Sequence, residues 1–355
     1  MVEVLIVDDL KSAREMIRDI LVSDPHIHIC GMADNGNEAV EMVKRVHPHL
    51  IILDSHLKQT SGYEVAEEIM QVRPTPIIMV TTASDALVDT PERMFGCGVL
   101  DVIEKRDLYR WRTRPDVAAG FIRKIKLLSK VNRTSIKKHC EKTETRPKTA
   151  DPINRGSLNI NASGKDENRI IAIVSSTGGP NALFKVLREL PSGFPAPILI
   201  VQHMSPGFIH GLAEWLNHED HIRVRVAENK GTLLPGEALL APDNAHLTVD
   251  ENHRIKLVDT PPVGGHRPSG NTLLKSIGEC YGRQALGIIL TGMGHDGAEG
   301  MAALKTAGGK TIAQDQNTSV IFGMPKSAIN LGAVDLVLPL SQIASAIVRF
   351  AKTGL

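Results

Sequence analysis

The chain has 355 residues, which is too long for one compact core and indicates two domains. Its 41 Lys and Arg residues and 40 Asp and Glu residues leave a net charge of +1, which argues against a general polyanion-binding surface. Aromatic residues make up only 3% of the chain, so recognition of nucleic acids by base stacking is not expected.

Residues 1–128 alternate short β-branched runs with amphipathic segments. Five strands alternating with five helices predict a doubly wound α/β domain with a parallel sheet of flavodoxin-like order. The expected strands are 2–7, 27–33, 50–53, 76–80 and 99–103, and the expected helices are 11–22, 36–46, 62–72, 86–95 and 116–130.

Polar side chains follow the strands of this first sheet. Asp8 and Asp9 end the first strand and Asp54 ends the third, and these strands are neighbours in a flavodoxin-like order. Three clustered carboxylates favour a hard cation such as Mg²⁺. Thr81 and Lys105 follow the fourth and fifth strands and supply a hydroxyl and an ammonium group. Together these groups are what a phosphoryl group on Asp54 would need.

This constellation resembles the receiver domain of response regulators over about residues 1–125. The resemblance implies that Asp54 accepts the phosphoryl group and that Asp8 and Asp9 hold Mg²⁺. It also implies that Thr81 is the switch hydroxyl and Lys105 the lysine that contacts the phosphoryl group.

The region that would transmit the signal departs from the receiver pattern. Residues 57–62 read Leu-Lys-Gln-Thr-Ser-Gly where the family has Met-Pro-x-Met-Asp-Gly. Val102 occupies the aromatic switch position, and Arg106 occupies that of the proline after the lysine. The residues expected to take part in phosphorylation are retained, while the surface expected to transmit the signal is altered.

Residues 129–168 lose periodicity and are rich in Lys, Thr, Asn and Ser, which predicts a solvated linker. From residue 169 to 355 the βα alternation resumes and predicts a larger, Rossmann-like α/β domain. A hairpin is expected over 246–259, with its turn at Asp250–Asn252. The expected strands are 170–174, 197–201, 223–227, 238–241, 286–290, 310–314 and 334–338.

Three segments of the second domain place a hydroxyl, an imidazole and a carboxylate after strands. Ser176 precedes two glycines and Pro180 at the start of an expected helix, His203 follows the second strand, and Asp296 lies in a glycine loop. These are the groups of a Ser-His-Asp hydrolase. The serine and glycines could equally form a nucleotide loop, and Asp296 could cap the helix expected at 297–306. The other histidines lack paired metal spacing, so a zinc hydrolase is not expected.

Six motifs in this domain resemble the catalytic domain of the chemotaxis protein-glutamate methylesterases (CheB family) over about 169–352. The resemblance implies Ser176 as nucleophile, His203 as general base and Asp296 as its partner, with oxyanion donors at Thr177 and Met293. Ser175 replaces the usual small alanine and adds a second hydroxyl. The motifs are IVSSTGGPNAL, VQHM, APDNAHLTV, GHRPSGNTLLKS, LTGMGHDGAEGM and FGMPKSAI.

The expected function is therefore phosphorylation-regulated hydrolysis of glutamyl γ-methyl esters, and deamidation of glutamines, on methyl-accepting chemoreceptors. Mg²⁺ is expected for receiver phosphorylation and no cofactor for the esterase. A chemotaxis histidine kinase is the expected phosphodonor, and the chain is expected to be a monomer. An adaptor with a nucleotide-binding second domain remains an alternative, as does an esterase of a non-flagellar chemosensory pathway.

Location follows from the cysteines and the N-terminus. The four cysteines, at positions 30, 97, 140 and 280, show neither CxxC nor metal-ligand spacing. No signal peptide and no apolar run of about 18 residues is seen. A cytoplasmic protein without membrane insertion is expected.

Overall fold

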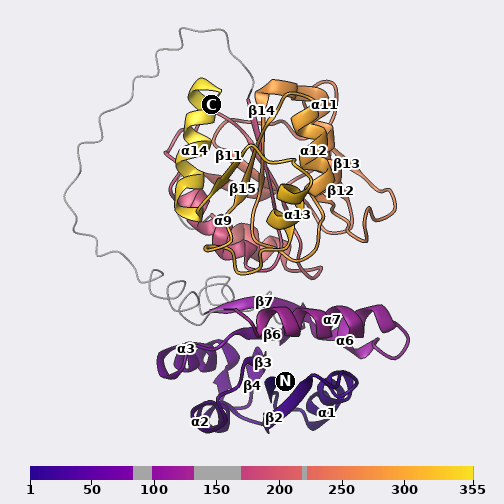
Figure 1. Ribbon diagram of the computed structural model, residues 1–355, viewed down its shortest axis with the longest axis vertical. Coiled ribbons are helices and arrows are strands. Elements are labelled where there is room, and N and C mark those ends of the chain that lie inside the picture. Colours follow the sequence, from indigo (N-terminus) through magenta and orange to yellow (C-terminus); the bar gives the residue numbers. More distant parts are fainter. Residues whose placement is uncertain (83–97, 132–168, 218–221, 355) are drawn as a thin grey trace, which may run out of the picture.

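The computed structural model describes residues 1–82, 98–131, 169–217 and 222–354. They form two α/β units, each built on a parallel sheet, with the C-terminal unit lying above the N-terminal one (Figure 1). The helix expected at 86–95 lies outside the described residues, as does the expected linker beyond residue 131.

The N-terminal unit is a five-stranded sheet in the order β2-β1-β3-β6-β7, with all neighbours parallel. This is the flavodoxin-like order expected from the sequence. Contacts pair α1 with α7 and α2 with α3, which puts helices on both faces. The elements are β1 (Val2–Val7), α1 (Lys11–Leu21), β2 (Ile27–Ala33), α2 (Gly36–Val46), β3 (Leu50–Asp54), β4 (His56–Leu57), β5 (Thr60–Ser61), α3 (Gly62–Val72), β6 (Ile77–Thr81), β7 (Val99–Glu104), α6 (Lys105–Tyr109) and α7 (Pro115–Leu128).

The C-terminal unit is a seven-stranded parallel sheet in the order β10-β11-β9-β8-β14-β15-β16. The expected hairpin is present as the separate pair β12–β13. The elements are β8 (Ile170–Ser175), α9 (Gly179–Arg188), β9 (Ile198–Gln202), α10 (Ile209–Leu216), β10 (Arg223–Val226), β11 (Glu237–Leu240), β12 (His246–Val249), β13 (Ile255–Val258), α11 (Gly270–Tyr281), η1 (Gly282–Gln284), β14 (Ala285–Ile289), α12 (Ala298–Thr306), β15 (Lys310–Gln314), α13 (Met324–Asn330), β16 (Leu336–Leu338) and α14 (Leu340–Thr353).

The central strand β8 separates two cores in this unit. Ile171 and Ile173 belong to the cluster that contains the buried faces of α9 and α14. Ile170, Ala172 and Val174 belong to the cluster beneath α11 and α12. Alternate residues of one strand point to opposite faces, so a fully apolar strand anchors both layers. The end of β8 is therefore a rigid place from which to present a side chain.

The topology of the seven-stranded sheet changes direction at β8. The chain moves from β8 to β9 on one side and later returns to β14 on the other side of β8. In open α/β sheets, ligands bind outside the carboxyl ends of the strands at such a switch point. The loops after β8, β9 and β14 meet there, and these are the loops that carry Ser176, His203 and Asp296.

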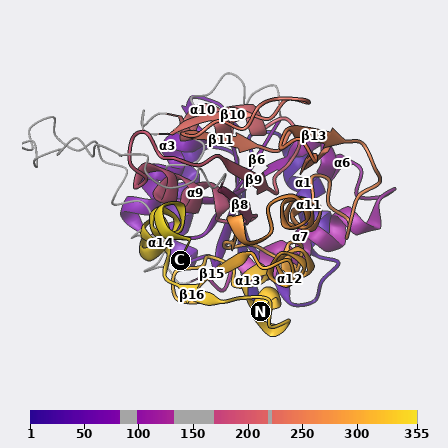
Figure 2. The same cartoon turned by 90° about the horizontal axis from the view of Figure 1, so that it is seen from above.

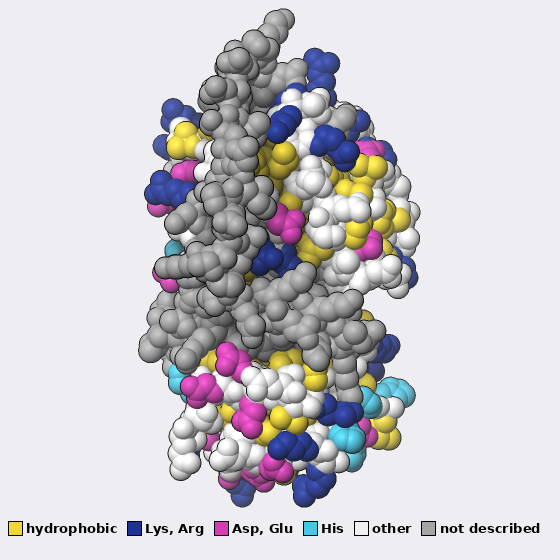
Figure 3. Space-filling model, turned by 90° about the vertical axis from the view of Figure 1, so that its left-hand side faces the viewer, with side chains coloured by type: hydrophobic (Ala, Val, Ile, Leu, Met, Phe, Trp, Pro, Cys, Tyr) yellow, Lys and Arg dark blue, Asp and Glu magenta, His cyan; other side chains and the backbone are white. Residues whose placement is uncertain are grey.

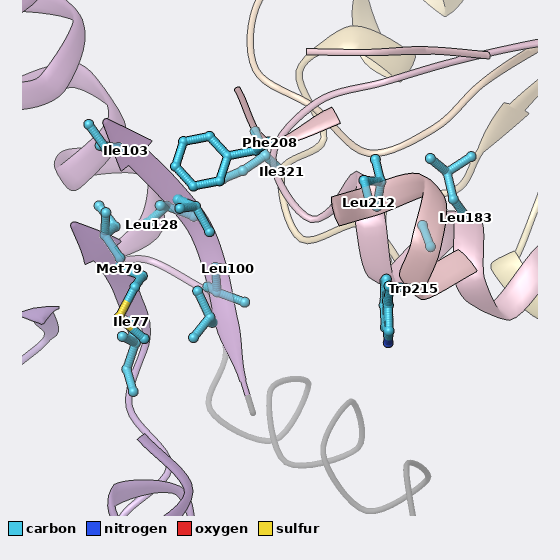
Figure 4. Close-up of a cluster of buried hydrophobic side chains, with 14 of the residues drawn as sticks. Ile77, Met79, Leu100, Ile103, Leu128, Leu183, Phe208, Leu212, Trp215 and Ile321 are labelled. Atoms are coloured by element: carbon cyan, nitrogen blue, oxygen red, sulfur yellow. The ribbon is translucent and has the colours of Figure 1, made fainter. Parts of the chain in front are cut away.

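The edge strand of the lower sheet, β7, lies against the upper unit at this end (Figure 1). Leu100 and Val102 of β7 share one buried apolar cluster with Phe208 and Ile321 of the upper unit. Figure 4 shows Leu100 and Ile103 on the side of the lower sheet and Phe208 and Ile321 facing them. The contact between the units is thus an apolar core next to the carboxyl ends of the strands in the C-terminal sheet.

Seen from above, the upper unit covers the lower one (Figure 2). On the face in Figure 3, basic and acidic side chains of the described residues are interspersed over both units, as the net charge of +1 suggests. In the described part of the chain, no helix combines the length and apolar character that a membrane crossing requires.

Candidate active site

The strand-end loops bring the three predicted side chains of the hydrolase site to one edge. Nε2 of His203 lies 2.9 Å from Oδ2 of Asp296, and both side chains are almost completely buried. Nδ1 of His203 is buried and has no hydrogen-bond partner among the described residues. Because Nε2 faces Asp296, Nδ1 is the ring nitrogen available to a nucleophile.

Asp296 is held by the start of a helix distant in sequence. Its carboxylate accepts hydrogen bonds from Oγ of Ser269 at 2.7 Å, from the N–H of Gly270 at 2.6 Å and from that of Asn271 at 3.2 Å. Burial opposes ionisation, but the hydrogen bonds from His203, Ser269 and Gly270 outweigh it and hold the pKa of Asp296 below its usual range. The carboxylate is therefore a fixed negative charge. It bonds the N-terminus of α11, whereas the residue that caps α12 is Gly297.

Ser176 is positioned by its backbone. Its N–H donates to the carbonyl of Thr291 at 3.1 Å, and its own carbonyl accepts from Nε2 of Gln202 at 2.8 Å. The neighbouring Ser175 is fully buried and donates its hydroxyl to Oε1 of Gln202 at 2.7 Å. Of the two adjacent hydroxyls, only that of Ser176 is uncommitted within the described residues.

The glycines around Ser176 serve close packing against protein atoms. A Cβ on Gly179 would lie 2.0 Å from Oε1 of Gln202, and one on Gly292 would lie 2.8 Å from Cβ of Ser176. Gly178 has a φ of +76°, a left-handed conformation that favours glycine. Because these glycines face side chains of the protein, the packing favours a nucleophile turn over a phosphate-binding loop.

Two backbone N–H groups border the nucleophile without a partner. Those of Thr177 and Met293 make no hydrogen bond to any described residue. The loops that carry them are joined where the hydroxyl of Thr291 donates to the carbonyl of Thr177 at 3.0 Å. Unpaired N–H groups next to a serine can bind the oxyanion of a tetrahedral intermediate.

Strand β7 of the N-terminal unit covers this edge. The carboxylate of Asp101 accepts from Oγ1 of Thr177 at 2.8 Å, and the carbonyl of Leu100 accepts from the N–H of Gly178 at 3.3 Å. Oγ of Ser205 accepts from the N–H of Glu104 at 3.3 Å. The cavity that remains between the two units has a volume of about 20 Å³ and is lined by Ser176, His203 and residues 99–102. It is large enough for about one water molecule and far too small for a protein segment.

The residues of the predicted phosphorylation site lie at the carboxyl ends of β1, β3 and β7. Carboxylate oxygens of Asp8, Asp9 and Asp54 lie within 4.8 Å of one another. Nζ of Lys105 lies 2.7 Å from Oδ2 of Asp8 and 2.8 Å from Oδ2 of Asp54. Burial and the nearby Asp8 charge raise the pKa of Asp54 to about 6 in spite of the lysine. Three converging carboxylates that repel one another fit a divalent cation with oxygen ligands.

The predicted switch hydroxyl has a partner that the sequence did not reveal. Oγ of Ser55, next to Asp54, donates to Oγ1 of Thr81 in a short, buried hydrogen bond. Val102, at the position of the missing aromatic, is buried between the units, and its carbonyl accepts from Oγ of Ser205 at 3.4 Å. One of the altered read-out positions, Val102, therefore lies in the contact between the units, whereas Arg106 is exposed.

Three site residues were given no role in the site from the sequence: Gln202, Ser269 and His266. Gln202 joins the loops after β8 and β9, Ser269 holds Asp296, and the ring of His266 stacks on that of His203. Two of them lie in the GHRPSGN segment, which supported the family resemblance without a role for its residues. His295, the neighbour of Asp296 in the sequence, is exposed.

Comparisons with known proteins agree with this geometry. A family model described as CheB methylesterase matches residues 171–347, and one described as response regulator receiver domain matches residues 4–109. A protein-glutamate methylesterase/protein-glutamine glutaminase of Geobacter metallireducens is 38% identical over 353 residues, covering 99% of both chains. Another from Syntrophus aciditrophicus is 38% identical over 352 residues, again covering 99% of both.

A solved structure is also similar. The CheB methylesterase catalytic domain of Thermotoga maritima matches 52% of this chain and 98% of its own with 39% sequence identity and a TM-score of 0.50. The match over full length with relatives that carry both units, together with the His203–Asp296 pair beside Ser176, settles the family. This chain belongs to the family of protein-glutamate methylesterases/protein-glutamine glutaminases that combine a receiver domain with a CheB methylesterase domain.

Proposed function

We propose that this protein hydrolyses glutamyl γ-methyl esters on methyl-accepting chemoreceptors with Ser176, His203 and Asp296 as its catalytic residues. The observation that carries the proposal is the buried His203–Asp296 pair at the switch point of the sheet, beside a serine whose hydroxyl is uncommitted. The names of the full-length relatives supply the ester substrate and the second activity, deamidation of glutamine.

The chemistry follows from the positions of these groups. Oγ of Ser176 attacks the ester carbonyl while Nδ1 of His203 takes the hydroxyl proton, and Asp296 stabilises the resulting imidazolium. The N–H groups of Thr177 and Met293 bind the oxyanion. His203 returns the proton to the departing methoxide, which leaves as methanol. Water then hydrolyses the acyl-enzyme to a glutamate, with His203 again as base. A glutamine amide would follow the same course and release ammonia.

Methanol release from methylated receptor membranes tests the assignment of the nucleophile. Ser176→Ala should abolish release, because the described residues offer no other uncommitted hydroxyl beside His203. Ser175→Ala is the matched variant and should retain turnover, since its hydroxyl is bonded to Gln202. Equal release by wild type and Ser176→Ala, or loss only in Ser175→Ala, would contradict the proposal.

The N-terminal receiver domain is proposed to gate this site. In the arrangement described above, β7 covers the strand ends and leaves a cavity of about 20 Å³, so a receptor helix has no access. Phosphorylation of Asp54 by a chemotaxis histidine kinase would weaken this contact. A hundredfold activation requires only about 2.7 kcal/mol of differential stability between the covered and open states. Asp54→Asn should keep the basal rate and lose activation by a phosphodonor; retained activation would refute the gate.

The acidic cluster of the receiver domain is proposed to hold Mg²⁺. Asp8, Asp9 and Asp54 would be the protein ligands, and the bound cation would supply charge neutralisation for the phosphoryl group. Lys105 and Thr81 would contact the phosphoryl oxygens. Binding to the folded state alone raises stability, so Mg²⁺ should raise the Tm of wild type and leave that of Asp9→Asn unchanged. An equal rise in both would contradict the ligand set.

The proposal places the enzyme in the cytoplasm as a monomer. Cys30 and Cys280 are free thiols, as a reducing compartment would keep them. The domain boundaries that accompany the proposal are 1–128 for the receiver, 129–168 for the linker and 169–355 for the esterase. Light scattering of the purified full chain tests the oligomeric state, since a stable dimer would give twice the monomer mass.

A further inference from the structure

A second histidine covers the ring of the proposed general base. The rings of His203 and His266 are stacked, with centroids 4.2 Å apart and an interplanar angle of 10°. The polar contact with Asp296 involves a single atom of the His203 ring, Nε2. One contact at one atom leaves the ring free to tilt about it. The stack supplies the missing restraint, because it fixes the plane of the ring.

His266 is delivered by a tight turn. Val263 and His266 exchange two backbone hydrogen bonds of 3.0 Å each. Between them, Gly264 and Gly265 have φ values of +59° and +84°, so both central positions require a left-handed conformation. Nη1 of Arg267 anchors the turn by donating to Oδ1 of Asp259 at 2.6 Å. The turn thus fixes the backbone from which the His266 side chain extends.

The same segment also holds Asp296. Three residues after His266, Ser269 donates its hydroxyl to Oδ1 of Asp296, and Gly270 donates its N–H to Oδ2. Residues 263–270 therefore contact both members of the pair: the imidazole through a stacked ring and the carboxylate through hydrogen bonds. A segment that fixes both members fixes their relative orientation.

The charge state of His266 suits this position. Burial, with a smaller contribution from the His203 charge, lowers the pKa of His266 to about 4, although Asp296 acts in the opposite direction and His295 in the same one. The ring is therefore uncharged near neutral pH. An uncharged neighbour does not repel the imidazolium that His203 becomes when it takes the proton of Ser176.

We propose that His266 is a positioning residue for His203: its stacked ring fixes the plane of the general base so that Nδ1 faces Ser176. This inference rests on the proposed role of His203 in ester hydrolysis. Misplacement of a reacting group by about 1 Å can cost about a hundredfold in rate. A residue that only orients the base should therefore act on kcat and leave KM nearly unchanged.

The test compares full-length variants in methanol release from methylated receptor membranes. His266→Ala should lower kcat about tenfold or more with KM within about twofold of wild type. His266→Phe restores a flat ring without the ring nitrogens and should recover kcat to within about threefold of wild type. The matched control is His253→Ala in the turn between β12 and β13. It removes another histidine in aromatic contact, here with Tyr281 of α11, and should leave kcat unchanged.

A spectroscopic reading separates orientation from loss of structure. In ¹⁵N-histidine-labelled protein, the proton on Nε2 of His203 should give a sharp downfield signal in wild type and His266→Phe and a broadened one in His266→Ala. Wild-type kcat in His266→Ala, or equal kcat losses in the Ala and Phe variants, would overturn the inference. Full activity in His203→Gln would instead overturn the base assignment. The two failures are therefore distinguishable.

Discussion

At the scale of single residues, the site depends on hydrogen bonds between segments far apart in sequence. The convergence of Ser176, His203 and Asp296 could be predicted, because parallel strands bring their carboxyl ends to one edge. The partner of Asp296 could not. An aspartate next to a helix start is expected to cap that helix, but this one bonds residues 26 and 27 positions earlier. Local sequence holds no signal for such a contact.

Removal of the Ser269 hydroxyl should reduce activity without abolishing it. Ser269→Ala deletes a 2.7 Å hydrogen bond to Asp296 but leaves the backbone donors of Gly270 and Asn271. A hydrogen bond to a charged group contributes about 1.5–3 kcal/mol. The free energy of unfolding should therefore fall by about this amount, and kcat should fall about tenfold. Kinetics of methanol release and urea unfolding provide the measurements. Ser345→Ala on α14, whose hydroxyl bonds only Gln342, is the control and should change neither.

The depressed pKa of Asp296 predicts a pH dependence of stability. A carboxyl group whose pKa is lower in the folded state stabilises the fold above its unfolded pKa, here 3.8, and loses that contribution as the pH falls through the folded value. The free energy of unfolding of wild type should therefore fall more steeply between pH 5 and pH 3 than that of Asp296→Asn. Urea titrations at these pH values measure the slopes, and parallel slopes would show that the carboxyl is unperturbed.

At the scale of elements, prediction succeeded where periodicity is long and failed where it is short. The strands of both sheets and helices such as α2 and α3 lie where the apolar pattern placed them, within about two residues at the ends. The two-residue strands β4 and β5 and the five-residue helix α6 were not predicted, because so few residues carry no period. The docking of β7 was also not foreseen. Its outer N–H and C=O groups are those of any edge strand, and nothing in its side chains indicates what covers them.

Weakening the contact of β7 with the active-site loop should raise the basal activity. In Asp101→Ala the 2.8 Å hydrogen bond from Thr177 is lost, together with the ion pair to Lys124. A loss of about 1–1.5 kcal/mol from the covered state corresponds to a rise of about five- to tenfold in methanol release without a phosphodonor. Asp116→Ala, which removes an exposed receiver aspartate paired with Arg114, should leave the basal rate unchanged. An unaltered rate in Asp101→Ala would mean that this bond does not hold the gate closed.

At the scale of the whole molecule, strand β7 connects the proposed phosphorylation site with the proposed esterase site. β7 ends at Glu104, next to Lys105, which bonds Asp54, and its middle residues cover Ser176 and His203. A change at the phosphorylation site therefore has a path of only a few residues to the esterase site. Val102 lies on this path: its side chain is buried, and its carbonyl accepts a hydrogen bond from Oγ of Ser205. The sequence predicts both sites but not the position of one over the other, because that placement depends on how two folded surfaces fit.

Hydrogen exchange can follow the opening of this contact directly. The amides of Gly178 and Glu104 donate across it, to the carbonyl of Leu100 and to Oγ of Ser205, whereas the amide of His203 donates to Ser175 inside the esterase sheet. An amide exchanges when its hydrogen bond opens, so phosphorylation with Mg²⁺ and a small acyl phosphate should speed exchange at Gly178 and Glu104 and leave His203 protected. In Asp54→Asn all three amides should keep their unphosphorylated rates. Uniform acceleration of exchange at all three amides in wild type would indicate loosening of the esterase domain itself. Unchanged exchange at Gly178 and Glu104 in an activated enzyme would show that activation occurs without separation of the domains.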